Sequence, residues 1–227
     1  MKVAVITAVF DGMDKEKPFC EQSLPEGFVC DRFFYTEDNS PVPLPNLPPR
    51  LQAKYFKTQS HHIPALQGYD IHVWIDGNIE VTNKGFIASL TYPLFGDEYA
   101  RVCIQKHHHR DTISEEIEFI LDSMDNPYLK TRYGKQPLAD EYAHYIGQGM
   151  PPTAPLYSCN VFARKVGRVS NGMFDAWWAL CVEWSWFDQS AFSYLAWSHG
   201  RMVHTVDMGG VTTSPYYTLH GHDEWNQ

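Results

Sequence analysis

Hydrophobic and polar residues form two kinds of pattern along the chain. One is typical of buried strands and the other of amphipathic helices. Short segments rich in β-branched and aromatic residues predict strands over residues 2–10, 28–35, 69–76, 99–105, 157–164 and 202–206. Helical spacing of apolar residues predicts helices over residues 50–60, 113–124 and 176–197. Strands that alternate with helices indicate an α/β fold with a mainly parallel central sheet and helices on both faces.

Capping and helix-breaking residues mark the ends of several predicted elements. Thr112 and Glu115 form a capping-box pattern just before the second helix. Pro48 and Pro49 precede the first helix, where a missing backbone N–H is tolerated. The proline-rich segment 40–49 is predicted to be a loop or lid, and the Gly- and Pro-containing segment 126–155 is predicted to be irregular.

Length, charge and cysteine content narrow the class of protein. A chain of 227 residues with 44% hydrophobic residues fits one folded α/β domain. Its net charge of −9 excludes a general nucleic-acid binder, which needs clustered Lys and Arg. Charged residues interrupt the longest apolar segment, so no membrane span is predicted. Five widely spaced cysteines without a Cys-x-x-Cys pair favour a reducing compartment, and we expect a cytoplasmic protein.

The strongest chemical signal follows the predicted strand 69–76, whose apolar residues lead into Asp76, Gly77 and Asn78. In open α/β sheets, ligands bind beyond the carboxyl ends of strands. Carboxylate and amide oxygens are the ligands that Mg²⁺ and Mn²⁺ prefer. Asp76 and Asn78 are therefore predicted to hold a divalent cation against a diphosphate. The alternative is a turn with a solvated carboxylate.

Four basic residues fall on one face of the helix that begins near residue 50, namely Arg50, Lys54, Lys57 and His61. In an acidic protein, a basic stripe that leads directly into the Asp76 strand is a candidate phosphate clamp. An ordinary solvated helix face is the alternative.

Two groups of histidines were considered as metal or pocket residues. Adjacent residues of an extended chain point to opposite sides, so at most two members of the triple at 107–109 can share one ion. A zinc site there is not favoured, and we expect His107 or Arg110 to line a pocket for the acceptor or the sugar. Three histidines nearer the C-terminus are candidates for the metal shell begun by Asp76: His204, His220 and His222. We place His220 in that shell.

Asp188 lies among aromatic residues in the sequence. Apolar surroundings raise the pKa of a carboxylate and make it a better base. Asp188 is therefore a candidate general base for activating an acceptor hydroxyl. A helix N-cap is an equally supported alternative. Trp186, close by, is a candidate for stacking on a sugar ring, although most tryptophans of this region should be core residues.

Several segments, taken in order, resemble a family of glycosyltransferase-like domains with the GT-A fold, found in plants and bacteria and long known only as a domain of unknown function. The matching segments are residues 5–14 with Pro18, residues 33–38, Lys54-Tyr55-Phe56-Lys57, residues 69–78, residues 107–110 with Glu115-Glu116, and Asp188-Gln189-Ser190. The Trp-Ile-Asp-Gly-Asn segment and the Thr-Ala-x-x-x-Gly-x-Asp opening are the best matches. Asn78 departs from the Asp-x-Asp signature of such enzymes, which lowers the expected metal affinity.

The resemblance implies a nucleotide-sugar donor and assigns places to several residues. Near the base and ribose it places Thr7, Ala8, Val9, Phe10 and Asp38. Near the diphosphate and metal it places Arg50, Lys54, Asp76, Gly77 and Asn78. The Asp188-Gln189 match adds Gln189 to the acceptor or sugar pocket.

The sequence thus predicts a single GT-A (Rossmann-like) domain over residues 1–227, with a nucleotide- and metal-binding half at 1–105 and an acceptor-side half at 106–227. The expected function is a glycosyltransferase of the hexosyl or deoxyhexosyl type, assisted by Mn²⁺ or Mg²⁺. Its donor would carry UDP or GDP, with UDP favoured, and its acceptor would be a glycan or glycoconjugate hydroxyl. Donor sugar, stereochemistry and oligomeric state stay open. A non-catalytic carbohydrate-binding protein is the alternative, followed by a metal-dependent hydrolase.

Overall fold

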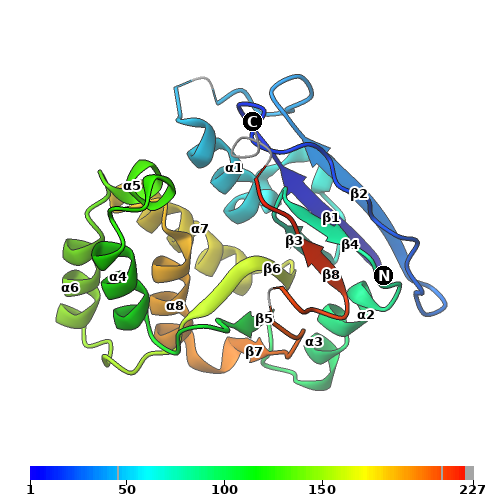
Figure 1. Ribbon diagram of the computed structural model, residues 1–227. Helices are drawn as coiled ribbons and strands as arrows, with labels where there is room; N and C mark the ends of the chain where they lie inside the picture. Colours follow the sequence, from blue (N-terminus) through cyan, green and yellow to red (C-terminus); the bar gives the residue numbers. More distant parts are fainter. Residues whose placement is uncertain (45, 211, 223–227) are drawn as a thin grey trace.

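The computed structural model describes residues 1–44, 46–210 and 212–222, and it is built around a six-stranded mixed sheet (Figure 1). Its strands, in spatial order, are β2 (Val29–Tyr35), β1 (Lys2–Ala8), β3 (Ile71–Ile75), β6 (Tyr157–Lys165), β5 (Val102–Lys106) and β7 (Val203–Thr205). β6 runs antiparallel to both of its neighbours, and the other neighbouring pairs are parallel. The carboxyl ends of the five remaining strands therefore meet at one edge of the sheet.

Helices and a small second sheet cover the two faces, as the sequence predicts. The helices are α1 (Pro49–Thr58), α2 (Phe86–Thr91), α3 (Pro93–Gly96), α4 (Ile113–Asp122), α5 (Pro127–Tyr133), α6 (Leu138–Gly147), α7 (Arg168–Glu183) and α8 (Asp188–His199). Short 3₁₀ turns are η1 (Ser60–His62), η2 (Pro64–Leu66) and η3 (Gly200–Met202). The second sheet pairs β4 (Ile79–Val81) with β8 (Tyr217–Leu219). In Figure 1, α4, α5 and α6 lie together at one end of the molecule, beyond α8.

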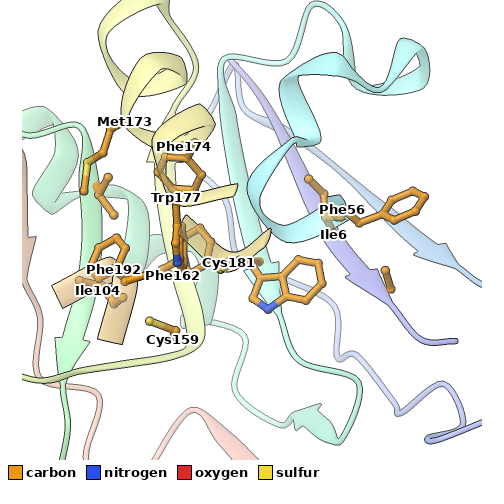
Figure 2. Packing of buried hydrophobic residues seen from close by; sticks show 14 of the residues in the cluster. Ile6, Phe56, Ile104, Cys159, Phe162, Met173, Phe174, Trp177, Cys181 and Phe192 are labelled. Atoms are coloured by element: carbon orange, nitrogen blue, oxygen red, sulfur yellow. The ribbon is translucent and has the colours of Figure 1, made fainter. Parts of the chain in front are cut away.

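The period-two pattern of β1 separates two hydrophobic cores. Ala4 and Ile6 face the core under α1, α7 and α8, whereas Val3 and Val5 face the core under α2, α3 and the small sheet. Figure 2 shows the first core, in which the ring centroid of the fully buried Trp177 lies 4.8 Å from that of Phe192 and 5.6 Å from that of Phe162. Tight aromatic packing on this face fixes where α1 and α8 lie above the sheet.

The prediction that residues 126–155 are irregular is wrong, because the segment contains α5 and α6. Its helix-breaking residues lie at helix ends, where they are tolerated. Asn126 caps α5 by accepting hydrogen bonds from the backbone N–H groups of Tyr128 and Leu129, at 2.9 and 3.3 Å, and a proline follows it at the first helical position. Pro137 immediately precedes α6. The capping box at Thr112 and Glu115 is confirmed at the start of α4.

The single helix predicted over residues 176–197 is two helices. α7 begins earlier, at Arg168, and ends at Glu183, and α8 begins at Asp188. The break between them contains Trp186, whose indole Nε1 donates to the carbonyl oxygen of Arg132 at 2.9 Å. The turn therefore brings the start of α8 and Trp186 to the carboxyl edge of the sheet, near α5.

Two further expectations concern membrane-spanning helices and the cysteines. None of the helices in the described ranges has the length and apolar surface that a membrane crossing requires. All five cysteines are free thiols.

A buried cluster around Arg164 of β6 gives the fold a defined acid sensitivity. Its Nη2 donates to Ser60 Oγ at 2.9 Å and contacts His61 Nδ1 at 3.0 Å, while His72 lies 2% exposed beside it. Burial, and then the charge of Arg164, lower the pKa of His72 to about 3 and that of His61 to about 4. Both imidazoles are therefore neutral in the folded protein at neutral pH.

We predict that the free energy of unfolding falls as the pH drops from about 6.5 towards 4. In this range the imidazoles of His61 and His72 bind protons in the unfolded chain but stay neutral in the folded protein. Each buried histidine adds a slope of up to about 1.4 kcal/mol per pH unit in this window. Urea unfolding at several pH values measures the slope. The variant His61→Gln should reduce it, whereas His109→Gln, at an exposed histidine, should leave it unchanged. A stability that is flat between pH 6.5 and 4.5 would contradict the assignment.

Candidate functional site

A pocket opens at the carboxyl edge of the sheet, beyond β1 and β3. The first half of the chain contributes Ala8, Val9, Phe10, Met13, Asp14, Pro49, Arg50, Ala53, Lys54, Trp74, Asp76 and Gly77 to its lining. The second half contributes Arg132, Trp186 and His222. The pocket thus lies at the strand ends where the sequence predicts a site, but both halves of the chain build it.

Asp76 follows β3 and presents its carboxylate to this pocket. Its Oδ1 accepts hydrogen bonds from Trp74 Nε1 at 2.6 Å and from Lys57 Nζ at 3.3 Å. Its backbone N–H donates to the carbonyl oxygen of Asn160 on β6 at 2.9 Å, which fixes the turn. Within the described residues its Oδ2 has no hydrogen-bond partner, and 37% of the side chain is exposed. One carboxylate oxygen is therefore held by the protein and the other remains available to a ligand.

Gly77 lets the loop after β1 pack directly against the strand end. A Cβ atom at this position would lie 2.5 Å from Val9 Cγ2 and 3.3 Å from Asp14 Oδ2. Any side chain would push these residues away from the pocket, so the glycine is needed for the close approach of the two loops.

Lys54 and Lys57 of α1 converge on Asp188, the first residue of α8. The two Nζ atoms lie 2.5 and 2.6 Å from Asp188 Oδ2, and the side chains are 14% and 1% exposed. Lys57 also reaches Asp76, so a chain of alternating charges runs from Lys54 through Asp188 and Lys57 to Asp76. The alternative that this helix face is simply solvated is wrong, because the lysines are enclosed between α1, α8 and the sheet edge.

The electrostatics of Asp188 differ from the sequence prediction. Burial by itself would raise the pKa of this carboxyl, but Lys54 and then Lys57 outweigh it and lower the pKa below its usual range. Burial likewise acts to lower the pKa of Lys57, and Asp188 and Asp76 outweigh it and raise the pKa. The expectation of a raised pKa at Asp188 is therefore wrong. A carboxylate held between two ammonium groups is a weak base.

The alternative that Asp188 starts a new helix is confirmed, although its position is one residue past the N-cap. Phe187 occupies the N-cap position of α8, and Asp188 is the first helical residue. A negative charge there is favourable near the helix N-terminus, in addition to the contacts with the lysines.

The predicted metal partners of Asp76 lie outside the pocket lining. The amide Nδ2 of Asn78 donates to the carbonyl oxygen of His220 at 2.9 Å, and Asn78 is buried. The ring of His220 contacts Glu80 Oε2 at 2.8 Å, because β4 and β8 pair side by side. The expectation that Asn78 and His220 face a cation beside Asp76 is thus not met. These residues join the small sheet to the end of β3.

Asp14 and His222 line the pocket together with Asp76 instead. His222 Nδ1 lies 2.9 Å from Asp14 Oδ2, and the His222 ring stacks against Tyr128 of α5 with a centroid distance of 6.2 Å. His222 is among the histidines that the sequence singles out, and Asp14 ends the Thr-Ala-x-x-x-Gly-x-Asp opening. The motif therefore carried a signal for Asp14 as a site residue.

Arg132 is a pocket residue that the sequence analysis missed. It lies on α5, in the segment predicted to be irregular, so no helical face could be assigned to it. Its guanidinium contacts the rings of Tyr128 and Tyr133, at 5.5 and 5.3 Å from the ring centroids. Burial acts to lower the pKa of Arg132, but Tyr133 and Tyr128 raise it, so the group stays cationic.

Other predicted residues lie at or beyond the edge of this pocket. Thr7 is buried within β1, and Asp38 lies in an exposed turn after β2. Gln189 is half-buried on α8 and is absent from the lining. Arg110 pairs with Glu116 and covers the ring of Phe119. His107 lines a separate pocket, beyond β5 and β7.

The first-half residues expected near the nucleotide are otherwise brought together as predicted. Ala8, Val9 and Phe10 form one wall, and Arg50 and Lys54 of α1 form another, with Asp76 and Gly77 between them. Trp186, expected in the sugar pocket, also lines it.

His61, His62 and Asp175 form a cluster whose ligand atoms all lie within 4.8 Å of one another. Arg164 has only donor hydrogens, so His61 Nδ1 must accept, and its Nε2 then carries the proton that points to Asp175 Oδ1 at 3.0 Å. A metal ion would need that proton removed from a neutral imidazole. The geometry is that of a structural hydrogen-bond relay. Over the described ranges, no other group of at least three His, Cys, Asp or Glu residues converges in this way, and the triple at 107–109 takes part in none.

Comparisons with known proteins identify the fold. No family model matches the chain, and a search of curated protein sequences found no match. Among solved structures, the chain is similar to mouse xyloside xylosyltransferase 1 in its apo form, with a TM-score of 0.50 and 13% identity over 91% of this chain and 86% of that one. It is also similar to a glycosyltransferase involved in glycosylation of the major capsid of PBCV-1, with a TM-score of 0.45 and 10% identity over 90% and 81% of the two chains. The chain has a GT-A-like glycosyltransferase fold.

Proposed function

We propose that this protein is a glycosyltransferase that moves a sugar from a nucleotide diphosphate, with UDP as the expected nucleotide, to a hydroxyl group of a glycan or glycoconjugate. The observation that carries the proposal is the shared pocket of Asp76, Arg50 and Lys54 at the carboxyl edge of the sheet. It combines a carboxylate for a divalent cation with basic residues for phosphates. The fold agrees with this chemistry, since the similar structure of xyloside xylosyltransferase 1 is that of a glycosyltransferase.

The pocket residues fit a divalent cation such as Mn²⁺ or Mg²⁺. Asp76 offers an oxygen that no described residue engages, and Asp14 and His222 line the same pocket. Carboxylate oxygens suit Mn²⁺ and Mg²⁺. We propose Asp76 as the principal ligand, with Asp14 and His222 as candidate partners in place of Asn78 and His220. When bound, the cation would neutralise negative charge that develops on the departing diphosphate.

The protein's own side chains supply the remaining steps. Arg50, Lys54 and Arg132 place positive charge around the position of the phosphates. Asp188 contacts both Lys54 and Lys57 and fixes the positions of their ammonium groups. Lys57 and Trp74 in turn orient the carboxylate of Asp76. Trp186 offers an apolar face on the side where a sugar would project. We therefore propose Asp188 as a positioning residue and not as a general base.

A thermal-shift experiment tests the proposal directly. UDP with Mn²⁺, at about 100 times its dissociation constant, should stabilise the protein by about 2.7 kcal/mol. For a chain of this length that corresponds to a rise in Tm of about 5–10 °C. Uridine with Mn²⁺ is the matched control, because it carries the base without the diphosphate, and it should produce little change.

GDP with Mn²⁺, and UDP without metal, complete the panel and separate base preference from metal dependence. No stabilisation by either nucleotide, with or without metal, would refute the donor site. Hydrolysis of UDP-sugars that bind would then identify the sugar.

A non-catalytic carbohydrate-binding protein remains the second hypothesis, and it needs neither metal nor nucleotide. The buried lysine and aspartate chain beneath Asp76 has no role in that hypothesis. Glycan binding that is unchanged in an Asp76 variant, with no donor hydrolysis by the wild type, would favour it.

A further inference from the structure

A second pocket, the β5–β7 pocket, opens at the same edge of the sheet as the first. It has a volume of about 470 Å³ and is lined by Gln105, Lys106, His107, His108, Thr205, Val206 and Asp207. β3 and β5 flank the antiparallel strand β6. Because neighbouring strands are about 4.8 Å apart, the ends of β3 and β5 are separated by about 10 Å. The two pockets therefore lie within the span of two linked sugar-sized groups.

The backbone opens the β5–β7 pocket where the strands part. The β5 and β7 ladder ends at the pair Ile104 and Thr205, after which Val206 N–H donates to the carbonyl oxygen of Ile104 at 3.0 Å. An irregularity in the β5–β6 pairing lies between Ile104 and Gln105. Such irregularities redirect side chains, and this one turns Gln105 into the pocket wall.

Gln105 carries a buried acceptor without a partner. Its side chain is 1% exposed, and its Nε2 donates to the hydroxyl of Tyr217 at 3.1 Å, while its Oε1 has no partner in the described residues. A buried polar atom left unsatisfied is costly. The oxygen is enclosed by the protein, so a ligand would reach it only after a local opening of the pocket wall.

His107 supplies a complementary donor in the same wall. Its Nδ1 accepts the backbone N–H of Arg110 at 3.2 Å. Burial, and then the charge of Arg110, lower the pKa of His107 to about 4, so the ring is neutral at pH 7. The proton of the neutral ring must then be on Nε2. A sugar hydroxyl can accept a hydrogen bond from such an N–H group.

Strand β6 connects the two pockets. Gln105 of β5 pairs with Ser158 of β6. The carbonyl oxygen of Asn160 accepts the backbone N–H of Asp76 at 2.9 Å. The wall of the β5–β7 pocket and the ligand-facing carboxylate are thereby fixed to the same strand, β6.

We propose that the β5–β7 pocket binds the acceptor of the transfer reaction, as a neutral polyhydroxylated sugar. This inference rests on the proposed function. The charge pattern separates the two pockets, because the first is rich in cations suited to phosphates, whereas Lys106 and Asp207 balance each other in the second. A neutral lining with both donors and acceptors suits sugar hydroxyls and not a phosphate.

The test measures binding of four simple sugars by NMR titration: the methyl β-glycosides of xylose, glucose and galactose, and methyl α-mannoside. The test variants are His107→Phe, which keeps a ring and removes the donor, and His108→Ala, at an exposed position of the lining. His109→Ala is the matched control, since it is exposed, adjacent and outside the lining.

We expect at least one glycoside to bind the wild type, and its dissociation constant to rise about three- to tenfold in each test variant, as for the loss of one hydrogen bond. His109→Ala should stay within about twofold of the wild type. Failure of all four glycosides to bind, or equal binding by His108→Ala and His109→Ala, would overturn the proposal.

Stabilisation by UDP and Mn²⁺ is measured on the same proteins and should be unchanged in all three variants. Its absence from the wild type, with the glycoside pattern as expected, would remove the donor function and leave the β5–β7 pocket as a sugar site. Normal UDP binding, together with glycoside binding that is the same in the wild type and in all three variants, would remove only the acceptor assignment.

Discussion

Replacing Asp76 by Asn is expected to lower the rate of sugar transfer at least about 100-fold, which is the usual order of loss when one electrostatic contact to the developing charge is removed. Asn keeps an oxygen that can accept from Trp74 Nε1 and Lys57 Nζ, so the side chain should hold its place. What disappears is the negative charge and the second oxygen, which no described residue engages. Stabilisation of the variant by UDP should then no longer depend on Mn²⁺.

Steady-state transfer and the thermal shift with and without Mn²⁺ measure the two effects separately. Asp11→Asn is the matched control. Asp11 also follows a strand of the same sheet edge, yet it does not line the pocket, and its positive φ of 62° suits Asn. Asp76→Asn with wild-type activity and metal response would end the assignment of this pocket to catalysis.

Replacing Asp188 by Asn is expected to destabilise the fold by about 3–5 kcal/mol, the usual cost of removing one partner from a buried ion pair. Lys54 and Lys57 would lose the carboxylate that lies 2.5 and 2.6 Å from them, and Lys57 would keep only the more distant Asp76, at 3.3 Å. Urea unfolding at pH 7 measures the loss. Asp140→Asn is the control, an exposed aspartate in the first turn of α6, and it should cost no more than about 1 kcal/mol.

Two further measurements show whether the cost comes from unpaired lysines. The double variant Asp188→Asn with Lys57→Met should be more stable than Asp188→Asn alone, because a buried unpaired charge is removed. The depressed pKa of Asp188 stabilises the fold above the pKa of an unfolded aspartate, near 4, and this contribution is lost as the pH falls below it. Asp188→Asn should therefore flatten the acid limb below about pH 4. An equally large effect of Asp140→Asn would show that helix-terminal charge, and not the lysine pair, is responsible.

Local pattern was sufficient for much of the sheet and for part of the pocket. Alternating apolar residues located β1 and β3, and the polar residues that end them located the pocket edge, because parallel strands place their carboxyl ends together. The spacing of Arg50 and Lys54 located the basic wall, since helical geometry alone puts them on one face. These features depend on neighbours within a few residues.

Features that depend on distant contacts were predicted wrongly or missed. Gly and Pro in residues 126–155 mark helix ends, and only the packing of Leu138 and Tyr145 beside α4 shows that helices form between them. Pairing of β4 with β8 directs His220 to Glu80, which no local signal indicates. Arg132 lines the pocket because α5 packs close to it, and this too depends on contacts between distant parts of the chain.

The sequence by itself determined the six strands of the main sheet, the strand-end location of Asp76 and the basic face of α1, because each follows from repeating local geometry. Only the tertiary structure decided the charge state of Asp188 and the partners of Asp76. Neighbouring aromatic residues suggested an isolated acid, whereas the fold brings two lysines from more than 100 residues earlier in the chain within 2.6 Å of it. A pKa is set by the charges and solvent around a group in space, and those are fixed only when α1 and α8 pack together over the edge of the sheet.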